Sequence, residues 1–352
     1  MFARQWFGPG TQHALHDDSI MFESLVRKRK YSKAINLGVL KGQSAKQIAE
    51  KDFWDRQISR ASRLKARDSK NSTIEVAFTR FWPGFQDEDN EIYYMLKRCA
   101  SLFGAKIKIN KEDPDLVIYS CFGNSLLNEY KKATRILYLG ENVRPHFGDT
   151  DYSLSFDHSD YCGRNIYLPL WFLRSSRYAS RSAGYDTYDP KCLELPNRIN
   201  NGRNSIVYVG NNSTPHRVEA IYELRRLGVE VDCYGSQTRP VTNKLDTLKQ
   251  YRYNLCFENS FSPGYVTEKI VDAFMAGSYP LYLGGISSSI FNLNQYFVCN
   301  EHLSIKQNMI NFVNWKKTTN LTYLPPLLHL GAFSQIENSV TNFLVKLLID
   351  LF

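Results

Sequence analysis

The sequence lacks the long hydrophobic runs that mark secreted and membrane-spanning proteins. Nothing in Met1–Ile20 has the apolar run of a signal peptide, and no segment reaches the roughly eighteen apolar residues expected of a spanning helix. The seven cysteines are odd in number and scattered, several of them within predicted strands, which favours reduced core residues over a disulfide framework. These absences predict a chain that works in the cytoplasm.

Clustered metal ligands and nucleic-acid motifs are also missing. The seven histidines are dispersed, and no group of His, Cys and Asp has the spacing of a metal site. Asp149, Asp151 and Asp157 lie close together in the sequence, but they suit the capping of turns and strands better than metal ligation. No platform of interleaved aromatic and basic residues occurs, so we expect no nucleic-acid partner.

Positive charge is concentrated at the start of the chain. The first 72 residues carry 15 Lys and Arg against 7 Asp and Glu, whereas the remainder carries 29 against 28. Clusters such as Arg27–Lys30 could touch an anionic membrane surface, although a solvated extension is the simpler interpretation. Residues 1–72 are therefore predicted to be a basic, partly helical extension, with peripheral membrane contact as its one candidate interaction.

The most informative segment is Tyr251–Gly285. Tyr251–Phe257 is rich in aromatic and apolar residues and predicts a buried strand, whose polar sequel should emerge at its carboxyl end, where open α/β sheets bind ligands. An apolar helical stripe then runs from Ile270 to Met275 and ends near Gly277. Tyr279–Gly285 predicts the next strand, so the segment is one βαβ unit.

Charged residues open the helix of this unit. The helix is predicted to start near Thr267, so an anion beside Lys269 would meet a fixed positive charge and free backbone N–H donors. The alternative is that Glu268 and Lys269 are a solvated first helical turn, which is the commoner role of such pairs.

Two upstream segments repeat the pattern of a strand followed by polar residues. Ile206–Gly210 predicts a strand, and Pro215 starts a helix with Val218, Ile221, Leu224 and Leu227 on its apolar face, which puts Arg217 in the first turn. Ile136–Leu139 predicts another strand, after which Glu141 should protrude. A carboxylate at such an edge can take a proton from a sugar hydroxyl, whereas an ordinary turn glutamate is the alternative.

Together these segments resemble the α1,3/4-fucosyltransferases, glycosyltransferase family 10, of a bacterial type without a membrane anchor. The match rests on the letters FEN, GYVTEK and PLYLGG within 251–285 and on RILYLGENVRPHFGDTDYSLSFD at 135–157. The resemblance implies that Glu141 is the catalytic base and that Tyr138 lies on the acceptor side. It further implies that Glu268 stabilises the sugar as a second catalytic carboxylate, and that the donor is bound by Arg217, Gly235, Asn259, Tyr265, Glu268 and Lys269.

The resemblance implies an α/β fold of the GT-B type, with two Rossmann-like domains facing one another across a cleft. We expect an acceptor-side domain over residues 73–175, a linker over 176–202 and a domain that binds GDP-fucose over 203–335. Residues 336–352 form an apolar helical pattern, predicted to pack back on the first domain.

The implied reaction is an inverting transfer of L-fucose from GDP-β-L-fucose to O3 of GlcNAc or Glc in a β-galactosyl glycan such as N-acetyllactosamine or lactose. No cofactor is required by this scheme, and stimulation by Mn²⁺ or Mg²⁺ is left open. The alternatives are another GT-B nucleotide-sugar transferase and a non-catalytic homologue that binds the donor or a carbohydrate.

Overall fold

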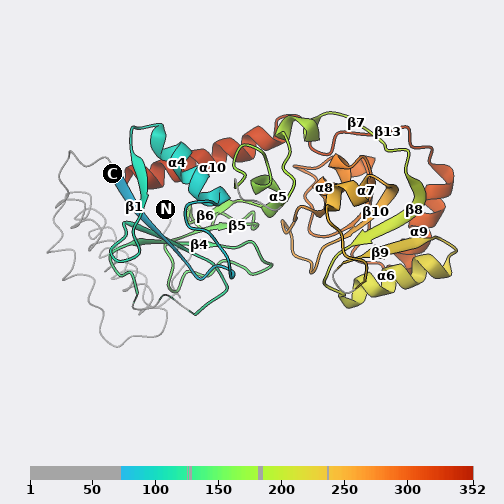
Figure 1. Cartoon of the computed structure of the whole chain (residues 1–352), viewed down its shortest axis with the longest axis horizontal. Helices are drawn as coiled ribbons and strands as arrows, with labels where there is room; N and C mark the ends of the chain where they lie inside the picture. The colour runs from blue at the N-terminus through green and yellow to red at the C-terminus, as the bar shows by residue number, and fades with distance from the viewer. Residues whose placement is uncertain (1–72, 125, 127–128, 181–184, 236–237, 352) are drawn as a thin grey trace, which may run out of the picture. The chain divides into compact units, whose positions relative to one another are not determined.

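The computed structural model describes residues 73–124, 126, 129–180, 185–235 and 238–351, so the predictions made for the basic extension 1–72 lie outside the described residues. The chain divides into two compact units (Figure 1). The first comprises the described residues up to Tyr167 together with those from Val340, and the second is Leu168–Ser339.

A parallel sheet forms the centre of the first unit. Its elements are β1 (Thr73–Thr79), α4 (Glu91–Ser101), β2 (Lys106–Ile109), β3 (Leu116–Tyr119), β4 (Thr134–Tyr138), β5 (Tyr152–Ser155) and β6 (Asn165–Tyr167). The strand order is β2-β1-β3-β4-β5-β6, and every pair is parallel. Strands β3 and β4 are buried along their whole length, as expected of central strands covered on both faces.

Local signals define the helix of this unit. The Asn90 side chain accepts a hydrogen bond from the Tyr93 N–H and so caps α4. Ile92, Met95, Leu96 and Cys99 are buried at helical spacing, and they pack the helix against the sheet. The helix ends at Ser101, and Leu102 is exposed.

The second unit is built around another parallel sheet, of order β12-β11-β10-β8-β9. Its elements are α5 (Leu170–Leu173), η1 (Pro190–Glu194), β7 (Asn197–Arg198), β8 (Arg203–Val209), α6 (Pro215–Arg226), β9 (Val231–Tyr234), α7 (Lys244–Leu248), β10 (Tyr251–Phe257), α8 (Lys269–Met275), β11 (Tyr279–Leu283), η2 (Leu293–Gln295), β12 (Phe297–Val298), α9 (Ile305–Thr318) and β13 (Tyr323–Leu324). The described part of residues 176–202, expected to be a linker, contains η1 and β7 and lies within this unit.

Both sheets have a topological switch point, where successive connections leave in opposite directions. In the first unit β1 is flanked by β2 on one side and β3 on the other. In the second unit β8 is flanked by β9 and β10. Ligands of open α/β sheets bind outside the carboxyl ends of the strands at such points. Each unit therefore offers one favoured position for a binding site.

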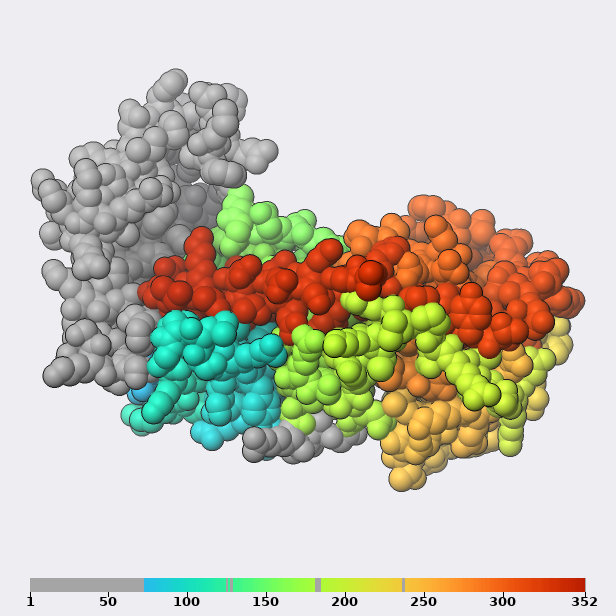
Figure 2. All heavy atoms as spheres, turned by 90° about the horizontal axis from the view of Figure 1, so that it is seen from above, coloured from blue at the N-terminus to red at the C-terminus, as the bar shows by residue number. Residues whose placement is uncertain are grey.

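The last helix, α10 (Ala332–Ile349), begins four residues earlier than the apolar pattern from Ile336 predicts. Its residues up to Ser339 belong to the second unit, and those from Val340 belong to the first. The helix is visible in red along the face shown in Figure 2, where its polar side meets solvent. No helix in the described part of the chain combines the length and apolar content that crossing a bilayer requires.

The Phe333 ring packs against other aromatic rings in the core of the second unit. The Phe333 ring stacks on Phe172 at a centroid distance of 4.5 Å and meets Trp171 at 6.2 Å. We predict that Phe333→Ala lowers the free energy of unfolding by about 3–5 kcal/mol, because it leaves a cavity among these rings. Urea denaturation would measure the change. Leu330→Ala, at an exposed position just before the helix, is the control and should change stability by less than about 0.5 kcal/mol.

Candidate active site

A cavity of about 520 Å³ opens at the carboxyl edge of the second sheet, a volume within the range of small-ligand sites. Its walls come from the segments that follow β8, β9 and β10, and from the starts of α6, α7 and α8. The lining residues are Val209, Gly210, Asn211, Asn212, Arg217, Gly235, Pro240, Val241, Lys244, Asn259, Glu268 and Lys269. The cavity therefore lies at the switch point between β8 and β10.

Close backbone approach shapes one wall of the cavity. A Cβ atom at Gly235 would collide with the carbonyl oxygen of Gly210, and the Gly210 N–H donates to the Tyr234 carbonyl at 2.9 Å. Glycine is thus required at 235 for the ends of β8 and β9 to lie together. The prediction placed Gly235 at the donor site, and the structure puts it on the wall of this cavity.

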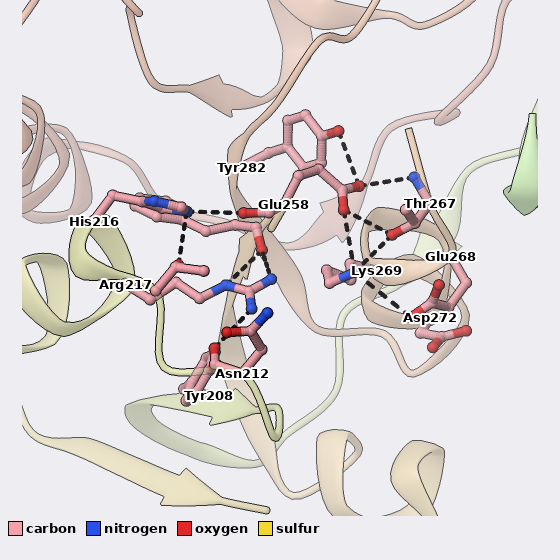
Figure 3. A network of polar contacts seen from close by, with 12 residues as sticks. Tyr208, Asn212, His216, Arg217, Glu258, Thr267, Glu268, Lys269, Asp272 and Tyr282 are labelled. Atoms are coloured by element: carbon pink, nitrogen blue, oxygen red, sulfur yellow. Dashed lines mark hydrogen bonds and ion pairs between the residues drawn. The ribbon is translucent and has the colours of Figure 1, made fainter. Parts of the chain in front are cut away.

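Arg217 lies in the first turn of α6 and is only 2% exposed (Figure 3). Its Nε donates to the Phe257 carbonyl at 3.0 Å, and one terminal nitrogen donates to the same oxygen. The other terminal nitrogen donates to the Asn212 carbonyl at 2.9 Å. Arg217 thereby joins the loop after β8 to the end of β10, the two strands that flank the switch point.

The buried face of α6 differs in part from the apolar face that the sequence predicted. Val218 was expected on the apolar stripe but is 53% exposed, whereas Arg217, Ala220 and Leu224 are buried. The reason is geometric, because the guanidinium reaches the strand carbonyls only if position 217 faces inward, which turns position 218 toward solvent.

Glu258 follows β10 directly and is completely buried. Its carboxylate accepts hydrogen bonds from the Thr267 N–H at 2.8 Å and hydroxyl at 2.7 Å, and from the Tyr282 hydroxyl at 3.2 Å. Lys269 Nζ lies 3.1 Å from it. A buried carboxylate needs this full set of donors. Glu258 therefore holds the turn between β10 and α8.

Lys244, the first residue of α7, connects two carboxylates of the neighbouring helix. Its Nζ lies 2.7 Å from Asp272 Oδ2 and 3.3 Å from Glu268 Oε1. Burial alone would lower the pKa of Lys244, but the ion pairs with Asp272 and Glu268 outweigh it and raise that pKa above its usual value. Burial would likewise raise the pKa of Glu268, yet Lys244 and Lys269 hold it far below its ordinary range.

The cations of the cavity differ in how completely carboxylates neutralise them. Lys244 pairs with Asp272 and Glu268, and Lys269 pairs with Glu258. Among the described residues Arg217 pairs with no carboxylate; its hydrogen bonds go to carbonyl oxygens, and its guanidinium lies over the Tyr208 ring. Partial charges of carbonyls offset far less than a carboxylate does, so the positive charge of the cavity is least neutralised at Arg217.

The start of α8 differs from the simple anion site that the sequence suggested. The helix begins at Lys269, with Glu268 at the N-cap position, and spans seven residues. The Lys269 ammonium turns to the Thr267 hydroxyl at 2.8 Å and to Glu258 (Figure 3). Glu268 and Lys269 are each 20% exposed and both line the cavity, so neither is a fully solvated surface charge.

The structure brings five of the six predicted donor-binding residues to one cavity. Asn259, Glu268 and Lys269 line it together with Arg217 and Gly235. Tyr265 is buried, its N–H donates to the Ser262 carbonyl at 2.9 Å, and it is not part of the cavity wall.

Glu141 and Tyr138 belong to the first unit, at the carboxyl end of β4. Glu141 is exposed, and its carbonyl accepts from the Val143 N–H at 2.7 Å. Tyr138 is buried, and its ring stacks on Phe81 at 6.0 Å. The Glu141 charge contributes to raising the pKa of Cys121, after the larger effect of burial, which places the carboxylate near the end of β3.

The neighbouring aspartates serve the first sheet. Asp149 accepts from the Tyr119 hydroxyl at 2.9 Å, and Asp151 accepts from the Arg135 N–H at 2.9 Å. Asp157 pairs with Arg144 at 2.6 Å. In the described part of the chain no group of three His, Cys, Asp or Glu side chains could hold a metal ion.

Sequence reasoning also missed or misplaced some residues. Lys244 was not singled out, because an Asn-Lys pair at the start of a short helix looks like an ordinary N-cap followed by a lysine in solvent. Its two partners lie 24 and 28 positions later in the chain. Cys99, Cys256 and Cys299 are buried, but the prediction of core cysteines is wrong for Cys162 and Cys192, which are exposed.

Comparison with known proteins identifies the family. The model of the alpha-(1,3)-fucosyltransferase FucT N-terminal domain matches residues 76–174, and that of the glycosyltransferase family 10 (fucosyltransferase) C-terminal region matches 201–324. The alpha-(1,3)-fucosyltransferase FucT of Helicobacter pylori is 27% identical over 310 residues, which are 78% of this chain and 63% of that protein. The 4-galactosyl-N-acetylglucosaminide 3-alpha-L-fucosyltransferase 9 of Bos taurus is 35% identical over 101 residues, 27% of each chain.

A solved structure extends the likeness to the fold. The crystal structure of an alpha1,3-fucosyltransferase with GDP-fucose has a TM-score of 0.53 at 22% identity, and the match covers 79% of this chain and 92% of that one. This likeness confirms the α/β fold with two Rossmann-like sheets of the GT-B type. With both domain models matched in order along the chain, this protein belongs to glycosyltransferase family 10, the fucosyltransferases.

Proposed function

We propose that the protein is an inverting α1,3-fucosyltransferase that moves L-fucose from GDP-β-L-fucose to a hydroxyl of a β-galactosyl-containing saccharide. The observation that carries the proposal is the cavity at the switch point of the second sheet, where Arg217 pairs with no carboxylate among the described residues. A nucleoside diphosphate supplies the anion that this charge favours.

The cavity also has the other features that a nucleotide sugar requires. Arg217 uses three of the five N–H donors of a guanidinium on protein carbonyls, which leaves one on each terminal nitrogen for phosphate oxygens. Val209, Pro240 and Val241 offer apolar contact for a nucleoside. Asn259 and the ionised Glu268 are suited to hydroxyl groups of the ribose or the fucose ring.

The proposed reaction is a single displacement. The Glu141 carboxylate takes the proton of the acceptor hydroxyl, and the oxygen attacks the anomeric carbon of fucose from the face opposite GDP. The bond between that carbon and the phosphate oxygen breaks, and its electron pair leaves with GDP. Arg217 and Lys269 offset the charge that develops on the diphosphate, and Glu268 stabilises the positive character of the sugar.

The reaction itself is tested by incubating the full-length protein with GDP-fucose and lactose, type 1 and type 2 disaccharides. We expect a product heavier by one fucose and linked at O3, identified by mass and linkage analysis. Transfer should persist in EDTA, because the scheme assigns charge neutralisation to side chains. Replacing GDP-fucose with GDP-mannose or UDP-galactose tests whether the protein is a transferase of this fold that uses another nucleotide sugar. Equal transfer from either donor would refute the assignment of GDP-fucose.

We predict that Glu141→Gln lowers the turnover number by about 10²–10⁴-fold, the range of a general base, and leaves GDP affinity unchanged. Steady-state kinetics and calorimetry with GDP measure the two quantities. Glu112→Gln, at another exposed position of the first unit, is the matched control and should behave as wild type. Unaltered turnover in Glu141→Gln would remove this residue from the mechanism.

Arg217→Lys should weaken GDP binding by about 10–100-fold, because a lysine cannot make paired hydrogen bonds to phosphate and the lost bonds involve a charged group. Calorimetric titration with GDP tests this, with thermal unfolding recorded in parallel. Arg226→Lys lies on the same helix but pairs with Glu223, so it should bind GDP normally. Equal affinity in both variants would contradict phosphate contact by Arg217.

Lys244→Met should make the donor site sensitive to acid. In the native protein the pKa of Glu268 is depressed, so the stability it adds is present above its ordinary pKa and is lost as pH falls through the folded value. Without Lys244, the largest of the nearby charges that lower that pKa is lost, so the pKa of Glu268 rises and the acidic limb of kcat/KM moves to higher pH. Profiles of kcat/KM against pH test the shift, and Lys249→Met, an exposed residue at the end of α7, should leave the profile in place.

A further inference from the structure

A set of aromatic side chains gathers at the carboxyl edge of the first sheet. We define the aromatic cluster as Phe81, Trp82, Phe85, Phe122 and Tyr138. Phe81 stacks on Phe85 at 3.9 Å and on Tyr138 at 6.0 Å. Trp82 meets the edge of Phe85 at 5.1 Å and of Phe122 at 6.1 Å. The cluster thus joins the segments that follow β1 and β3 to the last residue of β4.

The position of the cluster is the favoured ligand position of this unit. β1 lies between β2 and β3, so the switch point of the sheet is at β1. Phe81 and Trp82 follow β1, and Phe122 follows β3. The same rule that places the charged cavity of the second unit therefore predicts a binding site at the aromatic cluster.

The outer members of the cluster are left in water. Trp82 is 44% exposed and Phe122 is 49% exposed, whereas Tyr138 is buried at the base. Adjacent aromatic rings that stay exposed are typical of binding surfaces, because side chains with only a packing role are normally buried in the core. The indole N–H of Trp82 donates no hydrogen bond to the described residues, so it is available to a ligand.

The backbone beneath the cluster is held in an uncommon conformation. Arg80 has φ of 58°, in the left-handed region that a residue with a side chain rarely adopts. Its side chain fixes the turn, because Nε donates to the Asn124 carbonyl at 3.1 Å and a terminal nitrogen pairs with Glu129 at 2.6 Å. Arg80 thereby ties the segment after β1 to the segment after β3 and sets the rings of Trp82 and Phe122 beside one another.

We propose that the aromatic cluster is the acceptor subsite, and that a pyranose ring of the saccharide stacks its C–H face on Trp82 and Phe122. This inference rests on the proposed function. A hexose presents an apolar face that suits exposed aromatic rings, and hydroxyl groups at its rim that suit an indole N–H. The cluster ends at Tyr138, three residues before the proposed base Glu141. The Tyr138 hydroxyl lies beside Gly140, 3.0 Å from the position that a Cβ atom on that glycine would take.

Local charge favours a neutral sugar over a polyanion. Asp87, Glu88 and Asp89 follow Phe85 in the same loop, and of these Asp87 pairs with Lys111 at 2.6 Å. Nucleic acid would be repelled by this loop. A neutral saccharide is not, and its specificity would come from stacking and from hydrogen bonds to its hydroxyl groups.

The test compares Trp82→Leu, which keeps apolar bulk without an aromatic face, with Trp82→Phe, which keeps the face. We expect Trp82→Leu to raise the KM for lactose and N-acetyllactosamine by about tenfold or more, equivalent to 1.4 kcal/mol, with the KM for GDP-fucose unchanged. Trp82→Phe should stay within about threefold of wild type, since the ring contact is retained. Tyr222→Ala removes an aromatic ring of α6 that is more exposed than Trp82, at 63%, and should change neither KM.

Binding is also measured without turnover, so that failure of the proposed function can be told apart. Saturation-transfer NMR with lactose and the full-length protein should show contact to the ring C–H protons in wild type and its loss in Trp82→Leu. Contact without any fucose transfer would refute the proposed activity but support the subsite. An unchanged acceptor KM in Trp82→Leu, or an NMR signal that persists in that variant, would overturn the subsite.

Discussion

The second unit depends on a buried guanidinium that joins two adjacent loops. Arg217 binds the Phe257 carbonyl at the end of β10 and the Asn212 carbonyl after β8, the strands on either side of the switch point. Removing it would leave carbonyl oxygens unpaired in the interior, which costs more than the bonds themselves contribute. Because the same group lines the cavity, the charge proposed to meet the diphosphate is already held in place by the fold.

Buried carboxylates extend this preorganisation around the cavity. Glu258 holds Thr267, Tyr282 and Lys269, while Asp272 and Glu268 share Lys244. Charges removed from water persist only where partners surround them, so each of these groups fixes the orientation of the next. The result is a site in which the dipoles and charges need little rearrangement during a reaction.

The two sheets apply one topological rule to different ligand chemistries. At the switch point of the second sheet the side chains are cationic and amidic, which suits a nucleoside diphosphate. At the switch point of the first they are aromatic, with Trp82 and Phe122 exposed, which suits the face of a neutral sugar. A transferase needs both kinds of recognition, and the proposed function divides them between the two units. Functional chemistry is thus carried by the residues after the strands, and the sheets supply their positions.

The amino-acid sequence by itself determined the strands and the family. An apolar run placed β10 at its observed bounds, and short motifs drew attention to Arg217, Glu268 and Lys269, because strand burial and helix starts are local properties. Only the tertiary structure decided how these charges are used. It turned Arg217 inward so that Val218 faces solvent, placed the half-buried Lys244 between Glu268 and Asp272, and assembled the aromatic cluster from two loops and the end of β4. Each of these results joins residues far apart in the chain, and such pairings follow from strand order in the folded sheet, which no local pattern of residues records.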